Sequence, residues 1–144
     1  MGRLLSCLLV ACLSLSAVAA DAIKGERKEV FGDTTVHYST FISTFLTPET
    51  AKATELVRSK NQGVINVSVI KAGKPVFTQV SGTVKDLTSN SVPLKFKQIT
   101  EDDAIYYLAQ FPVEQQETRT FTINVRVDGK TETISFNQEL FPGQ

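Results

Sequence analysis

The sequence predicts an all-β protein: an antiparallel immunoglobulin-like β-sandwich of about seven to eight strands with one short helix. Three observations favour this fold. Apolar and polar residues alternate along most of the chain, turn-forming residues separate the alternating runs, and a single segment breaks the alternation with the signals of a helix start. Alternation places like side chains on one face of a half-buried strand. Short strands at regular spacing are typical of sandwiches or, as the alternative here, of a small barrel.

The clearest strands form a hairpin near the carboxyl end. Within residues 119–127, apolar side chains at Phe121, Ile123 and Val125 alternate with polar ones, and Asp128-Gly129 follows directly. This dipeptide favours a two-residue type I′ turn, because both positions require positive φ. We expect Thr131–Phe141 to be the partner strand.

The same alternation predicts six further strands upstream. They are Glu26–Phe31, Val36–Phe45, Val64–Lys71, Val76–Leu87, Leu94–Ile99 and Ala104–Phe111. Clusters of turn-forming residues separate the last four, at Ala72–Pro75, Ser89–Ser91 and Glu101–Asp103. Residues 105–109, Ile-Tyr-Tyr-Leu-Ala, are apolar on both faces, which predicts a central strand.

One segment has the features of a helix instead. Thr47-Pro48-Glu49 offers a hydroxyl for the N-cap, a proline at the first helical position and an early carboxylate. Ala53, Leu56 and Val57 provide a narrow apolar stripe, and Asn61–Gly63 provides a place to end. We expect a short helix that caps one end of the sandwich.

The first twenty residues have the pattern of a secretory signal peptide. An apolar, small-residue run from Leu4 to Ala20 precedes Asp21, and its alanines suit cleavage after Ala19 or Ala20. Leu9–Cys12 also resembles a lipobox, but a lipid on Cys12 would leave a very short apolar region before it. The prediction is therefore a cleaved peptide at 1–20 and a single β-sandwich domain at 21–144, periplasmic or secreted and without a membrane span.

Removal of the signal peptide limits the chemistry of the mature chain. Both cysteines, Cys7 and Cys12, and the one methionine, Met1, would leave with it. This excludes cysteine-dependent redox catalysis and thiolate metal sites. Loss of Arg3 leaves fourteen basic side chains against fifteen acidic ones, which disfavours nonspecific binding of nucleic acid. No cofactor is expected.

Few residues offer catalytic or metal chemistry. His37 is the single histidine and has no second histidine or cysteine to pair with, so a surface imidazole is the simpler interpretation. Glu101–Asp103 lacks the spacing of an EF-hand and is interpreted as a solvated turn. The chain carries no nucleophile elbow, phosphate-binding loop or dinucleotide fingerprint, so an enzyme is not predicted.

Four basic residues are close in sequence to the predicted helix and the first hairpin: Arg58, Lys60, Lys71 and Lys74. They form a candidate patch for an acidic partner. The alternative is that these side chains protect a strand edge from unwanted pairing.

The segment from Ser39 to Lys71 resembles a known family. The residues that carry the resemblance are Phe45-Leu46-Thr47-Pro48-Glu49, Arg58-Ser59-Lys60-Asn61 and Asn66-Val67-Ser68-Val69. The family comprises uncharacterised short exported proteins of Gram-negative bacteria, recorded as a domain of unknown function. The resemblance implies a periplasmic or secreted bacterial protein and brings no catalytic residues.

The function predicted from these observations is a noncatalytic binding or protein-interaction module, because a sandwich with this poor catalytic inventory suits recognition. The partner would be another exported or envelope protein. The contact surface predicted first is the Thr47–Gly63 element, with Arg58 and Lys60 as partner-binding residues. The alternative is a small apolar-ligand carrier in the periplasm.

Overall fold

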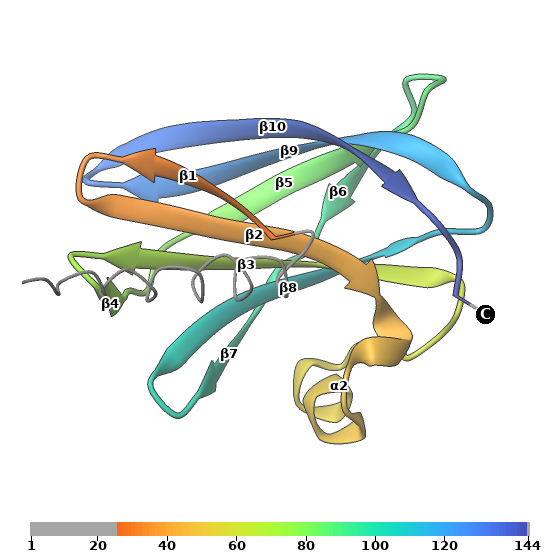
Figure 1. Ribbon diagram of the computed structural model, residues 1–144, viewed down its shortest axis with the longest axis horizontal. Coiled ribbons are helices and arrows are strands. Elements are labelled where there is room, and N and C mark those ends of the chain that lie inside the picture. The colour runs from red at the N-terminus through yellow and green to blue at the C-terminus, as the bar shows by residue number, and fades with distance from the viewer. Residues whose placement is uncertain (1–25, 144) are drawn as a thin grey trace, which may run out of the picture.

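The computed structural model describes residues 26–143, which form two antiparallel sheets packed face to face (Figure 1). One sheet has the order β1-β2-β3-β8-β7, with the short β4 also paired to β3, and the other has the order β10-β9-β5-β6. The prediction of an antiparallel β-sandwich with one short α-helix is confirmed. The strands are β1 Arg27–Phe31, β2 Thr34–Ile42, β3 Gln62–Lys71, β4 Lys74–Pro75, β5 Val80–Lys85, β6 Ser91–Leu94, β7 Lys97–Glu101, β8 Ala104–Pro112, β9 Glu117–Val127 and β10 Lys130–Leu140.

The structure has ten strands among the described residues, where the sequence predicts eight. β4, Lys74–Pro75, pairs with β3 at the predicted turn Ala72–Pro75, and the predicted strand 76–87 forms a ladder as β5, Val80–Lys85, which pairs with β9. Between them Thr78 leaves the ladder: its N–H donates to the Tyr107 hydroxyl at 2.8 Å and its hydroxyl donates to the Arg126 carbonyl at 2.6 Å. The predicted strand 94–99 divides into β6 and β7. The alternation continued through these crossings, so it did not reveal them.

The β9–β10 hairpin forms in the predicted register. Asp128 and Gly129 have φ of 51° and 80°, and Val127 pairs with Lys130. Positive φ at both central positions is the requirement of a type I′ turn, whose twist matches that of the strands it joins. The prediction for this turn is confirmed.

The core lies between the two sheets. Val36, Ile65 and Phe111 from one sheet and Phe121 and Ile123 from the other are almost fully buried. Aromatic rings connect the two layers: ring centroids are 5.1 Å apart between Phe111 and Phe121, 5.1 Å between Phe121 and Phe136, and 4.8 Å between Phe136 and Tyr38. Such aromatic pairs stabilise a core beyond the area that they bury.

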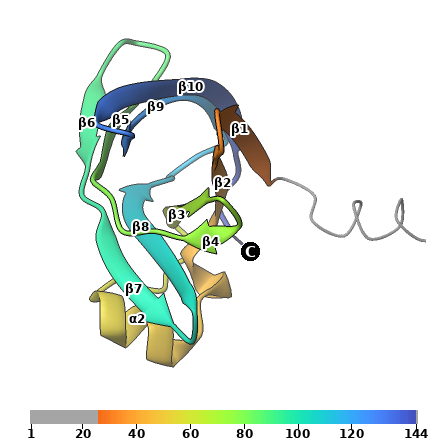
Figure 2. The same cartoon turned by 90° about the vertical axis from the view of Figure 1, so that its left-hand side faces the viewer.

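A second, smaller apolar cluster lies on the outer face of the larger sheet. Val64 of β3 and Leu108 of β8 point outward and are covered by Leu46 and by Ala51 of the helix α2, Pro48–Thr54. This explains why β8 is apolar on both faces, as expected for a strand between β3 and β7. The helix lies beside β7 (Figure 2) and covers part of this outer face, whereas the sequence predicted a cap over the end of the sandwich.

The helix begins as predicted and ends earlier. The Thr47 hydroxyl accepts a hydrogen bond from Thr50 N, and Pro48 opens the first turn. Glu55 then adopts φ of 58°, which ends the helix at Thr54. The predicted end of the helix at Asn61–Gly63 is wrong, because Gly63 belongs to β3. The predicted apolar stripe of the helix is also wrong, since Ala53 is exposed and Ala51 is buried instead.

No helix within residues 26–143 has the length and apolar character needed to cross a membrane. The predicted signal peptide, its cleavage after Ala19 or Ala20 and the Cys12 lipobox lie outside the described residues.

Candidate functional site

An apolar groove lies between the end of β2 and the end of β10. It holds about 290 Å³ and is open to solvent. Thr40 and Ile42 line it from β2, and Gln138 and Leu140 line it from β10, so its two walls belong to different sheets. We call this feature the β2–β10 groove.

Within the described residues, β1 pairs with only part of β2. Arg27 of β1 lies opposite Tyr38 of β2, and β2 continues for four more residues, to Ile42. On that side of Ser39–Ile42 no strand lies among residues 26–143. β10 continues to Leu140 on the opposite wall. Among residues 26–143, no strand therefore lies between Ser39–Ile42 and the end of β10.

Arg27 closes the seam where β1 is present. Its guanidinium lies 5.0 Å from the centre of the Phe136 ring and donates to the Asn137 carbonyl at 3.2 Å and to Gln138 Oε1 at 3.1 Å. These contacts join the first strand of one sheet to the last strand of the other. The groove begins directly beyond Gln138.

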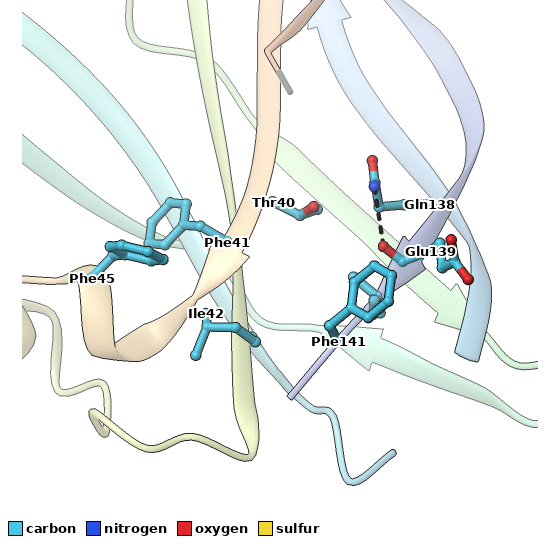
Figure 3. A pocket seen from close by; sticks show the side chains of 9 residues that line it. Thr40, Phe41, Ile42, Phe45, Gln138, Glu139 and Phe141 are labelled. Carbon is cyan, nitrogen blue, oxygen red and sulfur yellow. Dashed lines mark hydrogen bonds between the residues drawn. The ribbon is translucent and has the colours of Figure 1, made fainter. Parts of the chain in front are cut away.

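Two exposed phenylalanines flank the groove. Phe45 lies in the 3₁₀ helix η2, Ser43–Phe45, directly after β2, and Phe141 directly follows β10; their side chains are 78% and 52% exposed. Figure 3 shows the Phe45 ring next to Phe41 on one side and the Phe141 ring on the other. Aromatic side chains gathered at one open groove are typical of an interaction site, whereas single exposed apolar residues are not.

Gly63 of β3 also lines the groove. A Cβ at this position would lie 2.5 Å from the Phe111 ring, so only glycine lets that ring pack against the β3 backbone. The close approach of ring and backbone holds this wall of the groove in place.

The two predicted partner-binding residues flank the same groove. Arg58 and Lys60 are exposed in the loop between α2 and β3. Arg58 Nη2 donates to the Thr44 carbonyl at 3.2 Å, next to Phe45, and the Lys60 carbonyl accepts from Gly143 N at 2.8 Å, two residues beyond Phe141. Both residues therefore lie near the groove, and their role in partner binding stays a prediction.

The loop that carries Arg58 and Lys60 is fixed to η2. The Ser43 hydroxyl donates to the Ser59 carbonyl at 3.0 Å and accepts from Ser59 N at 2.8 Å, and Ser43 is fully buried. Two hydrogen bonds to one buried hydroxyl set the loop's distance from Phe45. The backbone of this loop is thus held next to η2.

The four residues of the candidate basic patch are not brought together. β3 runs from Gln62 to Lys71, so its ten residues separate Arg58 and Lys60 at one end from Lys71 and Lys74 at the other. A ten-residue strand spans about 33 Å. Lys71 instead pairs with Asp128 in the β9–β10 turn, which raises the pKa of Lys71 through their hydrogen bond.

A second hollow, of about 280 Å³, lies at this opposite end of the sandwich, beside Lys71, Asp128 and Phe77. Thr34 forms part of its wall, but the Thr34 hydroxyl is sealed from solvent and has no hydrogen-bond partner. The hollow lacks the paired exposed aromatics of the β2–β10 groove, since Phe77 is its one exposed aromatic residue.

The remaining candidates are not brought together. His37 Nδ1 lies 3.7 Å from Glu26 Oε1 on the outer face of β2, while its neighbours Val36 and Tyr38 point into the core. Glu101 is the last residue of β7, and Asp102–Asp103 form the turn to β8. Across the described residues, no three His, Cys, Asp or Glu side chains form a group able to hold a metal ion.

Sequence reasoning missed Phe45 and Phe141, which it assigned to the ends of strands. Phe141 directly follows β10 and precedes Pro142, whereas Phe45 ends the 3₁₀ helix that follows β2. An apolar residue next to a proline was the available signal for Phe141, because proline is disfavoured in a continuing strand.

Comparison with known proteins places this geometry in context. Residues 28–143 match the family model described as a domain of unknown function, DUF4426. A crystal structure of a DUF4426 family protein from Pseudomonas aeruginosa is 51% identical, with a TM-score of 0.80, over 85% of this chain and 99% of that one. No curated protein matches the chain.

Two more distant structures share the fold. FetP of uropathogenic Escherichia coli strain F11, expressed in the periplasm of Escherichia coli, is 10% identical with a TM-score of 0.63, over 83% of this chain and 96% of that one. A copper-bound variant of FetP is also 10% identical, with a TM-score of 0.64, over 82% and 96% of the two chains. At this identity the likeness concerns the fold alone.

Proposed function

This chain belongs to the DUF4426 family, and we propose that it is an exported, noncatalytic protein-interaction module that binds its partner through the β2–β10 groove. The observation that carries the proposal is the position of Phe45 and Phe141. Two strongly exposed aromatic side chains flank one apolar groove between the sheets. Aromatic residues are enriched where binding energy concentrates in protein interfaces.

The chemistry of the described residues favours binding over catalysis. His37 is the single imidazole, and it lies on the outer face of β2, away from the groove. Most general acid–base and nucleophilic mechanisms need at least two cooperating groups within hydrogen-bond reach. The groove itself offers Glu139, whose Oε2 accepts from Gln116 Nε2 at 2.9 Å.

Copper binding does not transfer from FetP to this chain. Cu(II) and Cu(I) prefer histidine, cysteine and methionine ligands in proteins. Residues 26–143 contain one histidine, no cysteine and no methionine. The donor set therefore does not fit a copper site.

We place the protein in the periplasm, with another exported or envelope protein as its partner. The amino-terminal pattern of a cleaved signal peptide supports this location. The periplasmic expression of FetP, which shares the fold, is consistent with it. The loop that carries Arg58 and Lys60 supplies positive charge at one side of the groove, which favours an acidic partner surface.

The test compares two double variants in intact cells. Phe45→Ser with Phe141→Ser removes both aromatic side chains at the groove, and the matched control, Phe77→Ser with Leu87→Ser, removes side chains that are 66% and 78% exposed elsewhere. After cross-linking, captured proteins are quantified by mass spectrometry. We expect the groove variant to lose at least about tenfold of its main partner and the control to retain it.

Both variants must first keep the wild-type melting temperature, since the replaced side chains are exposed. Equal capture by the groove variant, the control and the wild type would refute the groove as the binding site.

A carrier of small apolar ligands is the second candidate, and the apolar lining of the groove favours it. The volume of about 290 Å³ is at the lower limit of ligand sites, which hold roughly 300–1,000 Å³. Native mass spectrometry of protein purified from cells separates the two functions. We expect the mass of the polypeptide alone, whereas a retained small molecule would favour the carrier.

A further inference from the structure

A second concave site lies on the outer face of the larger sheet, between helix α2 and the end of β7. We propose that this site binds an alkylammonium group, which is a primary ammonium carried on a short apolar stem. The ammonium lies at Glu101, and the stem lies on the aromatic and aliphatic side chains next to it. We call the site the α2–β7 hollow.

The hollow has a largely apolar lining. It holds about 240 Å³, is open to solvent, and receives side chains from α2, from the segment before α2 and from four strands of the larger sheet. Leu46 and Leu108 in its wall are buried, whereas Phe41, Ile99 and Tyr106 are partly exposed. Two aromatic rings and one aliphatic side chain are therefore incompletely covered around a single concavity.

Strand register sets the order of these side chains. Ile99 of β7 pairs with Tyr106 of β8, so these two outward side chains stand next to each other. Leu108 follows Tyr106 by two residues and Glu101 follows Ile99 by two, which keeps both on the same face. Because β7 and β8 are antiparallel, Leu108 and Glu101 lie at opposite ends of this row. An apolar row thus leads to one carboxylate.

The charge of the hollow is negative. Of the described residues that line it, Glu101 is the one with a charge, and its carboxylate forms no ion pair with any residue of 26–143. Lys97, on the same face of β7, pairs instead with Glu55 at 3.1 Å. Asp102 and Asp103 follow in the turn to β8 and add negative charge at the same end. A ligand can therefore supply the positive charge that Glu101 lacks.

The aromatic lining favours the same class of ligand. A cation within about 6 Å of the centre of an aromatic ring is attracted to the face of that ring. The uncharged polar residues of the lining, Thr50 and Asn66, do not oppose a cation. The Thr50 N–H already donates to the Thr47 hydroxyl at 3.1 Å, so this N–H at the start of α2 is not available to an anion.

The volume limits the size of the ligand. Sites for drug-sized molecules hold roughly 300–1,000 Å³, and the hollow is smaller than this range. It suits one aliphatic chain with a terminal ammonium. Such a group is found in the side chain of a lysine on another protein and in a small free alkylamine.

The test titrates two pairs of probes into the isotope-labelled protein at low ionic strength, and amide shifts of residues 99–108 are followed by NMR. n-Pentylamine is compared with n-pentanol, which has the same stem without the charge. Nα-acetyl-lysine methylamide is compared with its norleucine counterpart. We expect the amine to bind at least about fivefold more tightly than the alcohol.

The second pair of probes identifies the source of the ammonium. A similar preference for the lysine compound over the norleucine compound would indicate a lysine of a partner protein. A preference confined to pentylamine would indicate a small free amine.

Variants connect the preference to the hollow. Glu101→Gln removes the charge at nearly constant size and should abolish the preference for the amine. Glu114→Gln, the matched control, removes an exposed carboxylate from the loop between β8 and β9 and should retain it. Tyr106→Leu keeps an apolar wall without the ring, and should weaken the amine at least about twofold while the alcohol binds as before. All three variants must keep the wild-type melting temperature.

Three results would overturn the ammonium site. The first is equal affinity of the wild type for amine and alcohol, and the second is a preference that survives Glu101→Gln. The third is an equal loss of preference in Glu114→Gln, because the amine would then respond to net charge alone. None of these results affects the proposed function, since neither Glu101 nor Tyr106 lines the β2–β10 groove.

Discussion

At the scale of single residues, Asp86 organises the turn between β5 and β6. Its Oδ1 accepts from the Thr88 hydroxyl at 2.8 Å, from Thr88 N at 2.9 Å and from Asn90 N at 2.9 Å. Hydrogen bonds to the charged carboxylate, the Thr88 hydroxyl first, lower the pKa of Asp86 to about 2.

This pKa gives a pH-dependent prediction. Because the pKa of Asp86 in the folded protein lies below its ordinary value of 3.8, the ionised carboxylate stabilises the turn above about pH 4, and this contribution is lost as the pH falls toward 2. An NMR titration of the Asp86 carboxyl carbon should therefore have its midpoint near 2. Thr88→Ala should raise it toward the usual value. A wild-type midpoint near 4 would contradict the hydrogen-bond geometry.

Gly82 is the residue at which the smaller sheet has no room for a side chain. A Cβ there would lie 2.4 Å from the Thr122 carbonyl oxygen of β9, which is backbone and cannot rotate away. We expect Gly82→Ala to lower the free energy of unfolding by about 1–3 kcal/mol, measured by urea denaturation. Ser81→Ala, an exposed neighbour on the same strand, serves as the control and should change it by less than about 0.5 kcal/mol.

At the scale of elements, helix α2 shows which signals are local. Its start was predictable because Thr47, Pro48 and Glu49 act within one turn of sequence. Its end was not, because Glu55 adopts a left-handed conformation that favours glycine and carries no sequence signal. The backbone N–H of Leu56 then bonds to the Ala51 carbonyl at 2.9 Å, which completes the helix end.

This helix end gives a stabilising substitution. Glu55→Gly removes the steric cost of a side chain at φ of 58° and should raise the free energy of unfolding by up to about 1 kcal/mol. The loss of the exposed contact between Glu55 and Lys97 offsets little of this gain. Glu55→Ala, which removes the same contact and keeps a Cβ, is the matched control. A stability of Glu55→Gly equal to that of the alanine variant would refute the strain.

Strand assignment from sequence was successful wherever one strand stays in one sheet. β9 and β10 were predicted with their turn, since alternation and the Asp128-Gly129 pair agree. The crossings at Thr78 and between β6 and β7 were missed because a strand that changes sheets keeps its alternation. The groove was missed for a related reason: it lies between β2 and β10, which are far apart in the sequence, so no single segment encodes it.

At the scale of the whole molecule, side-chain chemistry separates this chain from its copper-bound structural neighbour, although the two share a fold. The fold is shared at a TM-score of 0.64, yet residues 26–143 hold one histidine and neither cysteine nor methionine. We expect no stoichiometric copper in protein purified in copper-supplemented medium, and no rise in melting temperature on copper addition. One bound copper ion per chain by elemental analysis, lost in His37→Ala, would contradict this.

The exposure of Phe45 in a chain without tryptophan provides an optical probe of the groove. Phe45→Trp would create the single indole of the molecule, beside Phe41 and facing solvent. Its emission would begin at the long wavelengths of a hydrated indole and move to shorter ones when a partner excludes water from the groove. One substitution thus converts the most exposed ring at this site into a direct signal of occupancy, readable with purified protein and a tryptophan-free partner without labelling either one.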